Sequence, residues 1–237
     1  MATKKALLII RHAHDLPKEA DSQRIPNPNP DYTLPNSKTV KVSYTRLTQK
    51  GNDYGNPPAG EIQANNLGKS LSSWMANPNV KTDIYYEIGK VFVQDPMDGS
   101  WDSTPNPFNT IYPVIDPAKH PEVKNKPIDV NFYGNQVDLE KKKIFDDGNY
   151  STLLCATRQV IWGHKEQDHK HPENNHTYPD KGTFMDFIAD ASTKEVWEKL
   201  KHEPSKCKAI YVFTDFNEET HKFANLEVFT LDGDSIS

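Results

Sequence analysis

The chain contains short runs of uninterrupted apolar residues, and the first of them ends abruptly at a polar pair. Ala6-Leu7-Leu8-Ile9-Ile10 leads directly into Arg11-His12. A strand with one face in water alternates apolar and polar residues, whereas a strand covered on both faces is apolar throughout, as in a parallel sheet. Residues 6–10 therefore predict an interior strand, and such a strand requires layers of structure on both sides of its sheet.

Further strands and helices alternate along the chain after this first run. Four more strands are expected, at residues 89–94, 151–156, 209–214 and 226–231, the last of them at a sheet edge. This order predicts an α/β fold: a three-layer sandwich in which a mostly parallel central sheet carries helices on both faces.

Residues 60–74 have the pattern of an amphipathic helix, which Pro78 is expected to end. The apolar stripe expected to face the core consists of Ile62, Leu67, Leu71, Trp74 and Met75. A short helix is expected at residues 107–112, and another ends at Leu200 after a capping box formed by Ser192 and Glu195.

Length, charge and cysteine content limit the kind of protein this is. The 237 residues suit one sizeable domain, and a net charge of −5 argues against general binding to nucleic acid. No apolar run approaches the length of a membrane span, and the run after Met1–Lys5 is too short for a signal peptide. The two cysteines, Cys155 and Cys207, are interpreted as buried free thiols in a reducing compartment. These features predict a soluble cytoplasmic protein of one domain, residues 1–237, that has no membrane partner.

Three long segments, residues 17–46, 96–138 and 164–182, are expected to be loop insertions. The first is rich in Pro and Asn, and the first two are expected to shape the substrate site. The third contains four histidines, but solvated loop histidines are far commoner than metal ligands, so no metal is expected there. These histidines are His164, His169, His171 and His176.

Polar residues directly follow three of the expected interior strands. Arg11-His12-Ala13-His14 follows the first, Gln94-Asp95 the second and Thr157-Arg158-Gln159 the third. If these strands are parallel, the three groups converge at one edge of the sheet, which is where α/β proteins bind ligands. Because guanidinium groups match the geometry of phosphate oxygens, two arginines and a histidine there predict a site for an anion.

The sequence resembles the histidine phosphatase (phosphoglycerate mutase-like) superfamily in three segments. Residues 8–13 resemble the opening strand and its Arg-His-Gly or Arg-His-Ala signature. Leu47-Thr48-Gln49-Lys50-Gly51 and residues 60–68, which contain Gln63-Ala64 and Leu67-Gly68, resemble a Leu-Thr segment followed by a Gly-x-x-Gln-Ala-x-x-Leu-Gly helix. Residues 153–161 resemble the late strand and turn that normally deliver a second histidine.

The resemblance implies a phosphomonoester hydrolase in which His12 attacks phosphorus and forms a phosphohistidine that water then releases. It implies that Arg11 assists catalysis, that Arg11, Arg158 and His14 bind a small phosphorylated or anionic ligand, and that no metal or cofactor is needed. The chain differs from the family in two places. Arg158 stands where the second histidine is expected, and residues 107–111 lack the family's further arginine. No motif identifies the general acid, for which Asp15, Glu87 and Asp95 are candidates.

Two alternatives stay open at the level of sequence. The chain could be a catalytically silent relative whose Arg11, His12 and Arg158 bind a phosphorylated ligand without hydrolysing it. It could also be an unrelated α/β interaction protein in which the motif match arises by chance.

Overall fold

The computed structural model describes eleven stretches of the chain and the single residues Leu47 and Val160. The described stretches are residues 6–13, 25–27, 29–45, 60–76, 88–96, 104–119, 128–133, 151–157, 184–200, 209–232 and 235–236. Cys207, the histidines from His164 to His176, and Pro78 all lie outside these residues, so the predictions made for them stay predictions.

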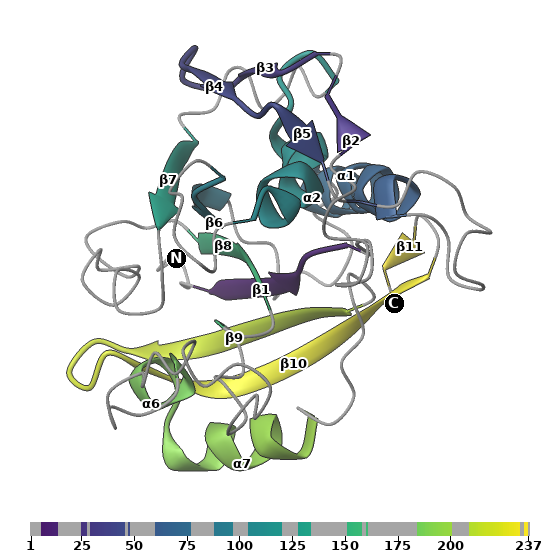
Figure 1. Cartoon of the computed structure of the whole chain (residues 1–237). Helices are drawn as coiled ribbons and strands as arrows, with labels where there is room; N and C mark the ends of the chain where they lie inside the picture. The colour runs from purple at the N-terminus through teal and green to yellow at the C-terminus, as the bar shows by residue number, and fades with distance from the viewer. Residues whose placement is uncertain are drawn as a thin grey trace, which may run out of the picture.

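A seven-stranded sheet forms the middle of the molecule (Figure 1). Its strands, in order across the sheet, are β11 (Ser235–Ile236), β10 (Lys222–Asp232), β9 (Ala209–Asn217), β1 (Leu7–Arg11), β8 (Ser151–Ala156), β6 (Ile88–Gln94) and β7 (Asp129–Tyr133). Strands β1, β8, β6 and β7 are parallel to one another, and each pair from β1 through β9 and β10 to β11 is antiparallel. The α/β class is therefore confirmed, with a sheet that is parallel from β1 to β7 and antiparallel from β1 to β11.

The interior position predicted for the first apolar run is confirmed. Leu7 to Ile10 are all buried, and β1 pairs with β8 on one side and β9 on the other. Strand β7 was not predicted, since it lies in the segment 96–138 that was expected to be irregular. Its pattern is weaker because it is an edge strand of five residues, in which Asp129 is exposed and Asn131 is half-buried.

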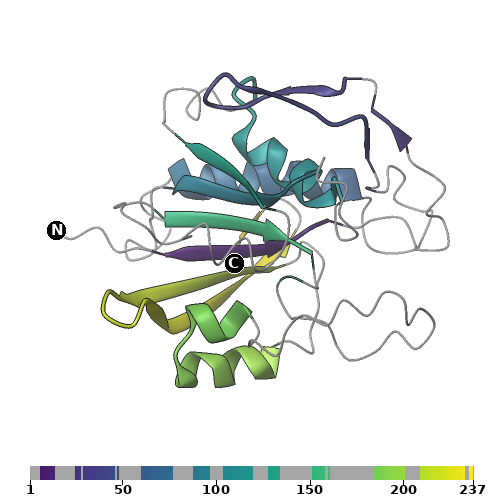
Figure 2. The same ribbon diagram turned by 60° about the vertical axis from the view of Figure 1, so that its left-hand side comes forward.

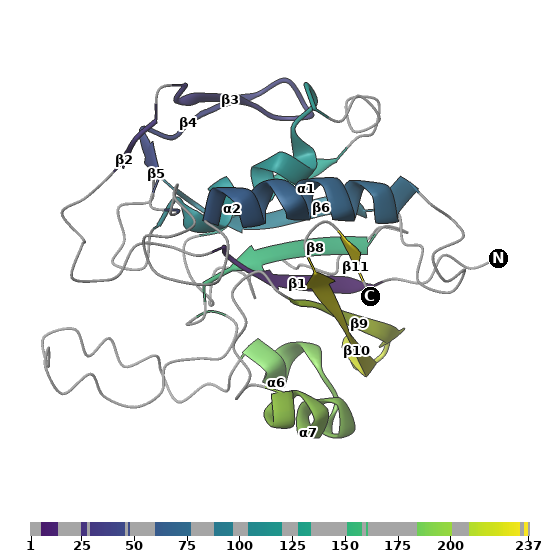
Figure 3. The same cartoon turned by 90° about the vertical axis from the view of Figure 1, so that its right-hand side faces the viewer.

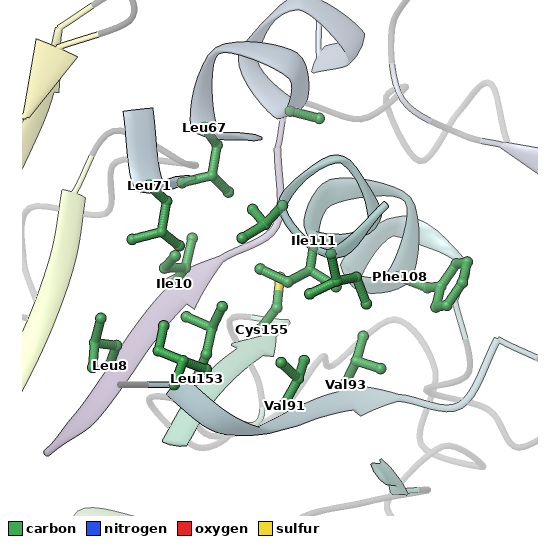
Figure 4. Packing of buried hydrophobic residues seen from close by; sticks show 14 of the residues in the cluster. Leu8, Ile10, Leu67, Leu71, Val91, Val93, Phe108, Ile111, Leu153 and Cys155 are labelled. Atoms are coloured by element: carbon green, nitrogen blue, oxygen red, sulfur yellow. The ribbon is translucent and has the colours of Figure 1, made fainter. Parts of the chain in front are cut away.

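Two helices, α1 (Gly60–Ala76) and α2 (Asn106–Ile115), cover one face of the sheet (Figure 2). Leu8 and Ile10 of β1 lie on this face, together with Cys155 of β8. Ile10 lies beside Leu71 of α1, and Cys155 lies beside Ile111 of α2 (Figure 4). Cys155 is buried and is not part of a disulfide, which agrees with the prediction for this residue. Helix α2 confirms the short helix expected near residue 107 and is longer than expected, because Pro113 is accommodated within it.

Helices α6 (Phe184–Ile188) and α7 (Ala191–Leu200) lie on the opposite face (Figure 3). They pack there against Leu7, Ile9 and Phe213, and the largest side chain of this cluster is Trp197. Described helices thus pack on both faces. On the second face the described helices, α6 and α7, lie against β10, in the antiparallel half of the sheet (Figure 3). A three-layer sandwich across the whole sheet therefore stays a prediction.

The helix predicted at residues 60–74 is confirmed as α1, but one member of its stripe is placed differently. Leu67 and Leu71 are buried as expected, whereas Ile62 is 46% exposed. Ile62 lies on the face of α1 that also carries the exposed Asn65 and Lys69, whereas Gln63 and Ala64 of the same turn are buried. The side chains of Trp74 and Met75 lie outside the described residues.

The start of α7 differs from the predicted capping box. Asp190, not Ser192, is the cap, because its Oδ1 accepts a hydrogen bond from the Thr193 N–H at 2.8 Å and another from the Ser192 hydroxyl at 2.9 Å. The Thr193 N–H is the main reason that the pKa of Asp190 is lowered from its usual 3.8. A carboxylate at this position satisfies an otherwise unpaired N–H and interacts favourably with the helix dipole.

The segment 17–46, expected to be a loop insertion, contains two small antiparallel ladders. They pair β2 (Ile25–Pro26) with β5 (Tyr44–Thr45) and β3 (Asp31–Thr33) with β4 (Thr39–Lys41). The β3–β4 hairpin lies over α2 (Figure 1), where the Tyr32 ring packs edge-on against Phe108 at 5.2 Å and Tyr112 at 4.5 Å.

No helix among the described residues is both long and apolar enough to cross a membrane. The division of the chain into one domain, residues 1–237, stays a prediction.

Candidate functional site

The carboxyl ends of β1, β8 and β6 meet at one edge of the sheet, as the sequence predicts. The strands are parallel neighbours, and their register pairs Arg11 with Ala156 and Cys155 with Val93. The polar residues that follow the strands therefore begin at the same level: His12 after β1, Thr157 after β8 and Asp95 after β6. This convergence is the geometry that α/β proteins use to assemble a ligand site.

His12 is the best-defined polar group at this edge. Its side chain is buried, with 5% exposure, and its backbone N–H donates to the Ala156 carbonyl at 3.2 Å, which extends the parallel ladder one residue beyond β1. Its ring Nδ1 lies 2.8 Å from the Ala13 carbonyl oxygen. A carbonyl can only accept, so Nδ1 carries the proton, and the lone pair of the neutral ring is on Nε2.

A contact with α2 fixes the turn that follows His12. The Ala13 N–H donates to the Thr110 hydroxyl at 2.9 Å, and that hydroxyl donates in turn to the Asn106 carbonyl at 2.7 Å. Ala13 and Thr110 are both fully buried. The turn carrying His12 is therefore held between β8 on one side and the first half of α2 on the other.

Arg11 lies next to His12 but on the other face of β1. Side chains alternate along a strand, and β1 shows this alternation: Leu7 and Ile9 belong to one core cluster, Leu8 and Ile10 to the other. Arg11 follows the first set and is half-buried at the last position of β1. An arginine that is to share a ligand with His12 must therefore reach around the end of the strand.

The remaining predicted ligand-binding residues, Arg158 and His14, lie outside the described residues. The structure therefore brings Arg11 and His12 to the sheet edge, and the roles of Arg158 and His14 stay predictions. Of the candidate acids, Asp95 is described at the end of β6, where its N–H donates to the Tyr133 carbonyl at 2.8 Å. Asp15 and Glu87 are not described.

Tyr133, the last residue of β7, connects β7 to β8 near this edge. Its ring is fully buried, and its hydroxyl donates to the Cys155 carbonyl at 3.2 Å. Burial, with a smaller effect of Cys155, raises the pKa of Tyr133 well above its usual value of 10.0. The phenol therefore stays neutral and remains a donor, which holds β7 to β8 across the end of β6.

Two residues at this edge were given no role from sequence. Thr110 lies in the predicted helix at residues 107–112, but its contact with Ala13 joins positions that are 97 residues apart. Thr157 was noted only as the residue that follows the third apolar run. The signal that could have singled it out is this position, because Thr157 directly follows β8 just as His12 directly follows the neighbouring strand β1.

The part of the chain that the structure describes contains no group of three or more His, Cys, Asp or Glu side chains suited to hold a metal ion. The expectation that catalysis needs neither metal nor cofactor stays a prediction.

No protein-family model and no curated protein matches this sequence. A solved structure from Nakamurella multipartitia, of a protein provisionally assigned as the phosphohistidine phosphatase SixA, is similar over 95% of both chains, with 9% sequence identity and a TM-score of 0.36. A similarity this small carries no argument about function, so the interpretation of the site depends on the residues themselves.

Proposed function

We propose that the chain is a phosphomonoester hydrolase of the histidine phosphatase type, in which His12 is the nucleophile. We further propose that it is a single cytoplasmic α/β domain with three layers, acting on a small phosphorylated ligand without metal or cofactor. The observation that carries the proposal is the hydrogen bond from His12 Nδ1 to the Ala13 carbonyl, at the carboxyl edge of a parallel sheet.

This hydrogen bond suits a nucleophile for two reasons. It fixes the tautomer whose lone pair is on Nε2, the nitrogen that would attack phosphorus. It also places a carbonyl dipole against the Nδ1 proton, and that interaction strengthens as the ring gains positive charge during the attack. The backbone contacts of His12 and Ala13 hold the ring in place, so no rearrangement is needed before reaction.

The proposed reaction has two displacements at phosphorus. In the first, Nε2 of His12 forms a bond to phosphorus, the bond from phosphorus to the ester oxygen breaks, and the leaving oxygen takes up a proton. In the second, water attacks phosphorus, loses a proton and displaces the imidazole, which releases inorganic phosphate. Arg11 and Arg158 would neutralise the charge on the phosphoryl oxygens, and His14 would contribute a further contact.

The test compares wild-type protein with His12→Ala in hydrolysis of an aryl phosphate and in formation of a phosphohistidine. Phosphorylated protein is quenched in alkali, where the phosphorus–nitrogen bond survives, and the modified residue is located by mass spectrometry. We expect label on His12 in the wild type, and we expect His12→Ala to lose both the label and the hydrolysis.

His221→Asn is the matched control, because His221 is an exposed histidine in the β9–β10 turn, where asparagine tolerates the observed φ of 54°. This variant should behave as the wild type does. Hydrolysis that survives in His12→Ala contradicts the proposal. Stabilisation of the wild type by phosphate without any turnover or phosphohistidine would instead support the silent, anion-binding relative.

A further inference from the structure

Thr157 presents a buried hydroxyl with no hydrogen-bond partner within the described part of the chain. The residue is 6% exposed, and its Oγ1 is shielded from solvent. Buried polar atoms in folded proteins are nearly always paired, because an unpaired hydroxyl loses its hydrogen bonds to water and gains nothing in return. A hydroxyl left in this state calls for a specific explanation.

The register of the sheet places this hydroxyl beside His12. Arg11 pairs with Ala156, and the His12 N–H continues the ladder to the Ala156 carbonyl, so the next residues along the two strands, His12 and Thr157, are cross-strand neighbours. Adjacent strands lie about 4.8 Å apart.

The two side chains also share a face. The pair before them, Ile10 and Cys155, belongs to the core cluster beneath α1 and α2 (Figure 4). Since two residues further along a strand return to the same face, His12 and Thr157 both continue this row. The threonine hydroxyl therefore lies on the α2 side of the sheet, as His12 does.

We propose that the Thr157 hydroxyl donates a hydrogen bond to an oxygen of the phosphoryl group that His12 attacks. This inference rests on the proposed function and adds a binding residue to it. It explains the unpaired hydroxyl as a donor whose partner arrives with the substrate. A neutral donor on this face also complements Arg11, which leaves β1 from the other face.

A second residue on the same strand provides an internal comparison. Ser151, at the opposite end of β8, is 1% exposed, and its hydroxyl is likewise buried without a partner in the described structure. It lies at the amino edge of the parallel strands, a strand length away from His12. Ser151 and Thr157 therefore share burial and lack of pairing but differ in whether a phosphoryl group at His12 could reach them.

The experiment measures thermal stability against inorganic phosphate concentration for the wild type and for Thr157→Val, Thr157→Ser and Ser151→Ala. Valine matches the shape of threonine without the hydroxyl, so we expect Thr157→Val to melt at or above the wild-type temperature without phosphate. A hydrogen bond to a charged group is worth about 10- to 100-fold in an equilibrium constant, and we expect Thr157→Val to bind phosphate more weakly by that factor. Thr157→Ser and Ser151→Ala should bind phosphate as the wild type does.

The outcomes separate this inference from the proposed function. If Thr157→Val binds phosphate as tightly as the wild type, the role of Thr157 is wrong while that of His12 stands. If phosphate stabilises no variant and the wild type forms no phosphohistidine, both are wrong. Equal weakening in Ser151→Ala would also overturn the inference, because the effect would then follow from any change in β8. If Thr157→Val fails to fold, Thr157→Ala replaces it, because alanine lacks the threonine hydroxyl and does not add the methyl group that valine puts in its place.

Discussion

Gly68 allows a close contact between α1 and α2, and replacing it tests how tightly the two helices are held together. A Cβ atom at this position would lie 2.7 Å from the Pro113 carbonyl oxygen and 2.9 Å from the Pro113 carbonyl carbon. Both atoms belong to the backbone of α2, so no change of rotamer can relieve the contact. Gly68→Ala therefore requires the helices to move apart.

Two effects of opposite sign set the size of the change. Alanine is favoured over glycine in a helix interior by about 1 kcal/mol, whereas forcing an extra carbon into a packed interface costs about 1–3 kcal/mol. Because the opposing atoms are backbone, we expect the cost to lie in the upper part of that range and the net destabilisation to be about 1–2 kcal/mol. For a chain of this length this corresponds to a fall in Tm of about 2–8 °C.

The assay is urea unfolding followed by circular dichroism, together with a thermal melt of the same samples. Lys69→Ala is the control, because Lys69 is an exposed residue beside Gly68 on α1, and its change in stability should stay within about 0.5 kcal/mol. If Gly68→Ala is more stable than the wild type, the helix preference of alanine outweighs the contact. The close packing of α1 on α2 would then be looser than the distances indicate.

Other predictions concern the helices on each face. Leu67→Ala should destabilise the fold by about 2–5 kcal/mol because Leu67 is buried, whereas Ile62→Ala should change the free energy of unfolding little because Ile62 is exposed. Equal losses of stability in chemical unfolding would contradict the assignment of Leu67 to the buried face of α1 and of Ile62 to the exposed face. Asp190→Ala should cost about 1 kcal/mol through loss of the α7 cap, and Asp190→Asn, which keeps an accepting oxygen, should cost less. The pKa of Asp190 is lowered in the folded state, so the carboxylate stabilises the fold above its unfolded-state pKa and loses this effect as the pH falls through the folded-state pKa. The difference in free energy of unfolding between the wild type and Asp190→Asn should therefore become smaller as the pH falls from 7 to about 3. A difference that stays constant over this range would show that the charge of Asp190 is not its cause.

The strands of the core could be predicted because a strand that is buried on both faces consists almost entirely of apolar residues. Ser151–Ala156 has the predicted bounds, since every one of its residues is buried and none has to alternate. Strand β7 gave no such signal, because it has a neighbour on one side only and carries Asp129 and Asn131. Strand β9 continues beyond the predicted end at Thr214 to Asn217, with Asp215 in a left-handed conformation that a pattern of apolar residues cannot indicate.

The position of His12 was predictable for the same reason, since a polar residue directly after a buried strand marks the end of that strand. What sequence could not supply was the contact of Ala13 with Thr110 or the unpaired state of the Thr157 hydroxyl. Both depend on how α2 and β8 are placed around β1. The cap of α7 shows a related limit, because Asp190 and Ser192 are both good capping residues. The backbone N–H of Asp190 donates to the Phe223 carbonyl in β10, and this tertiary hydrogen bond, which holds Asp190 at the start of α7, cannot be read from the local sequence.

The central position of β1 has a consequence for how the protein matures on the ribosome. Leu7 is synthesised long before its neighbours in the sheet, Thr152 and Phe213. The apolar strand β1 therefore cannot be enclosed until the segments that carry β8 and β9 have also emerged. Contacts so distant along the chain slow folding and leave apolar segments exposed to aggregation, so we expect the nascent protein to depend on chaperones that shield β1.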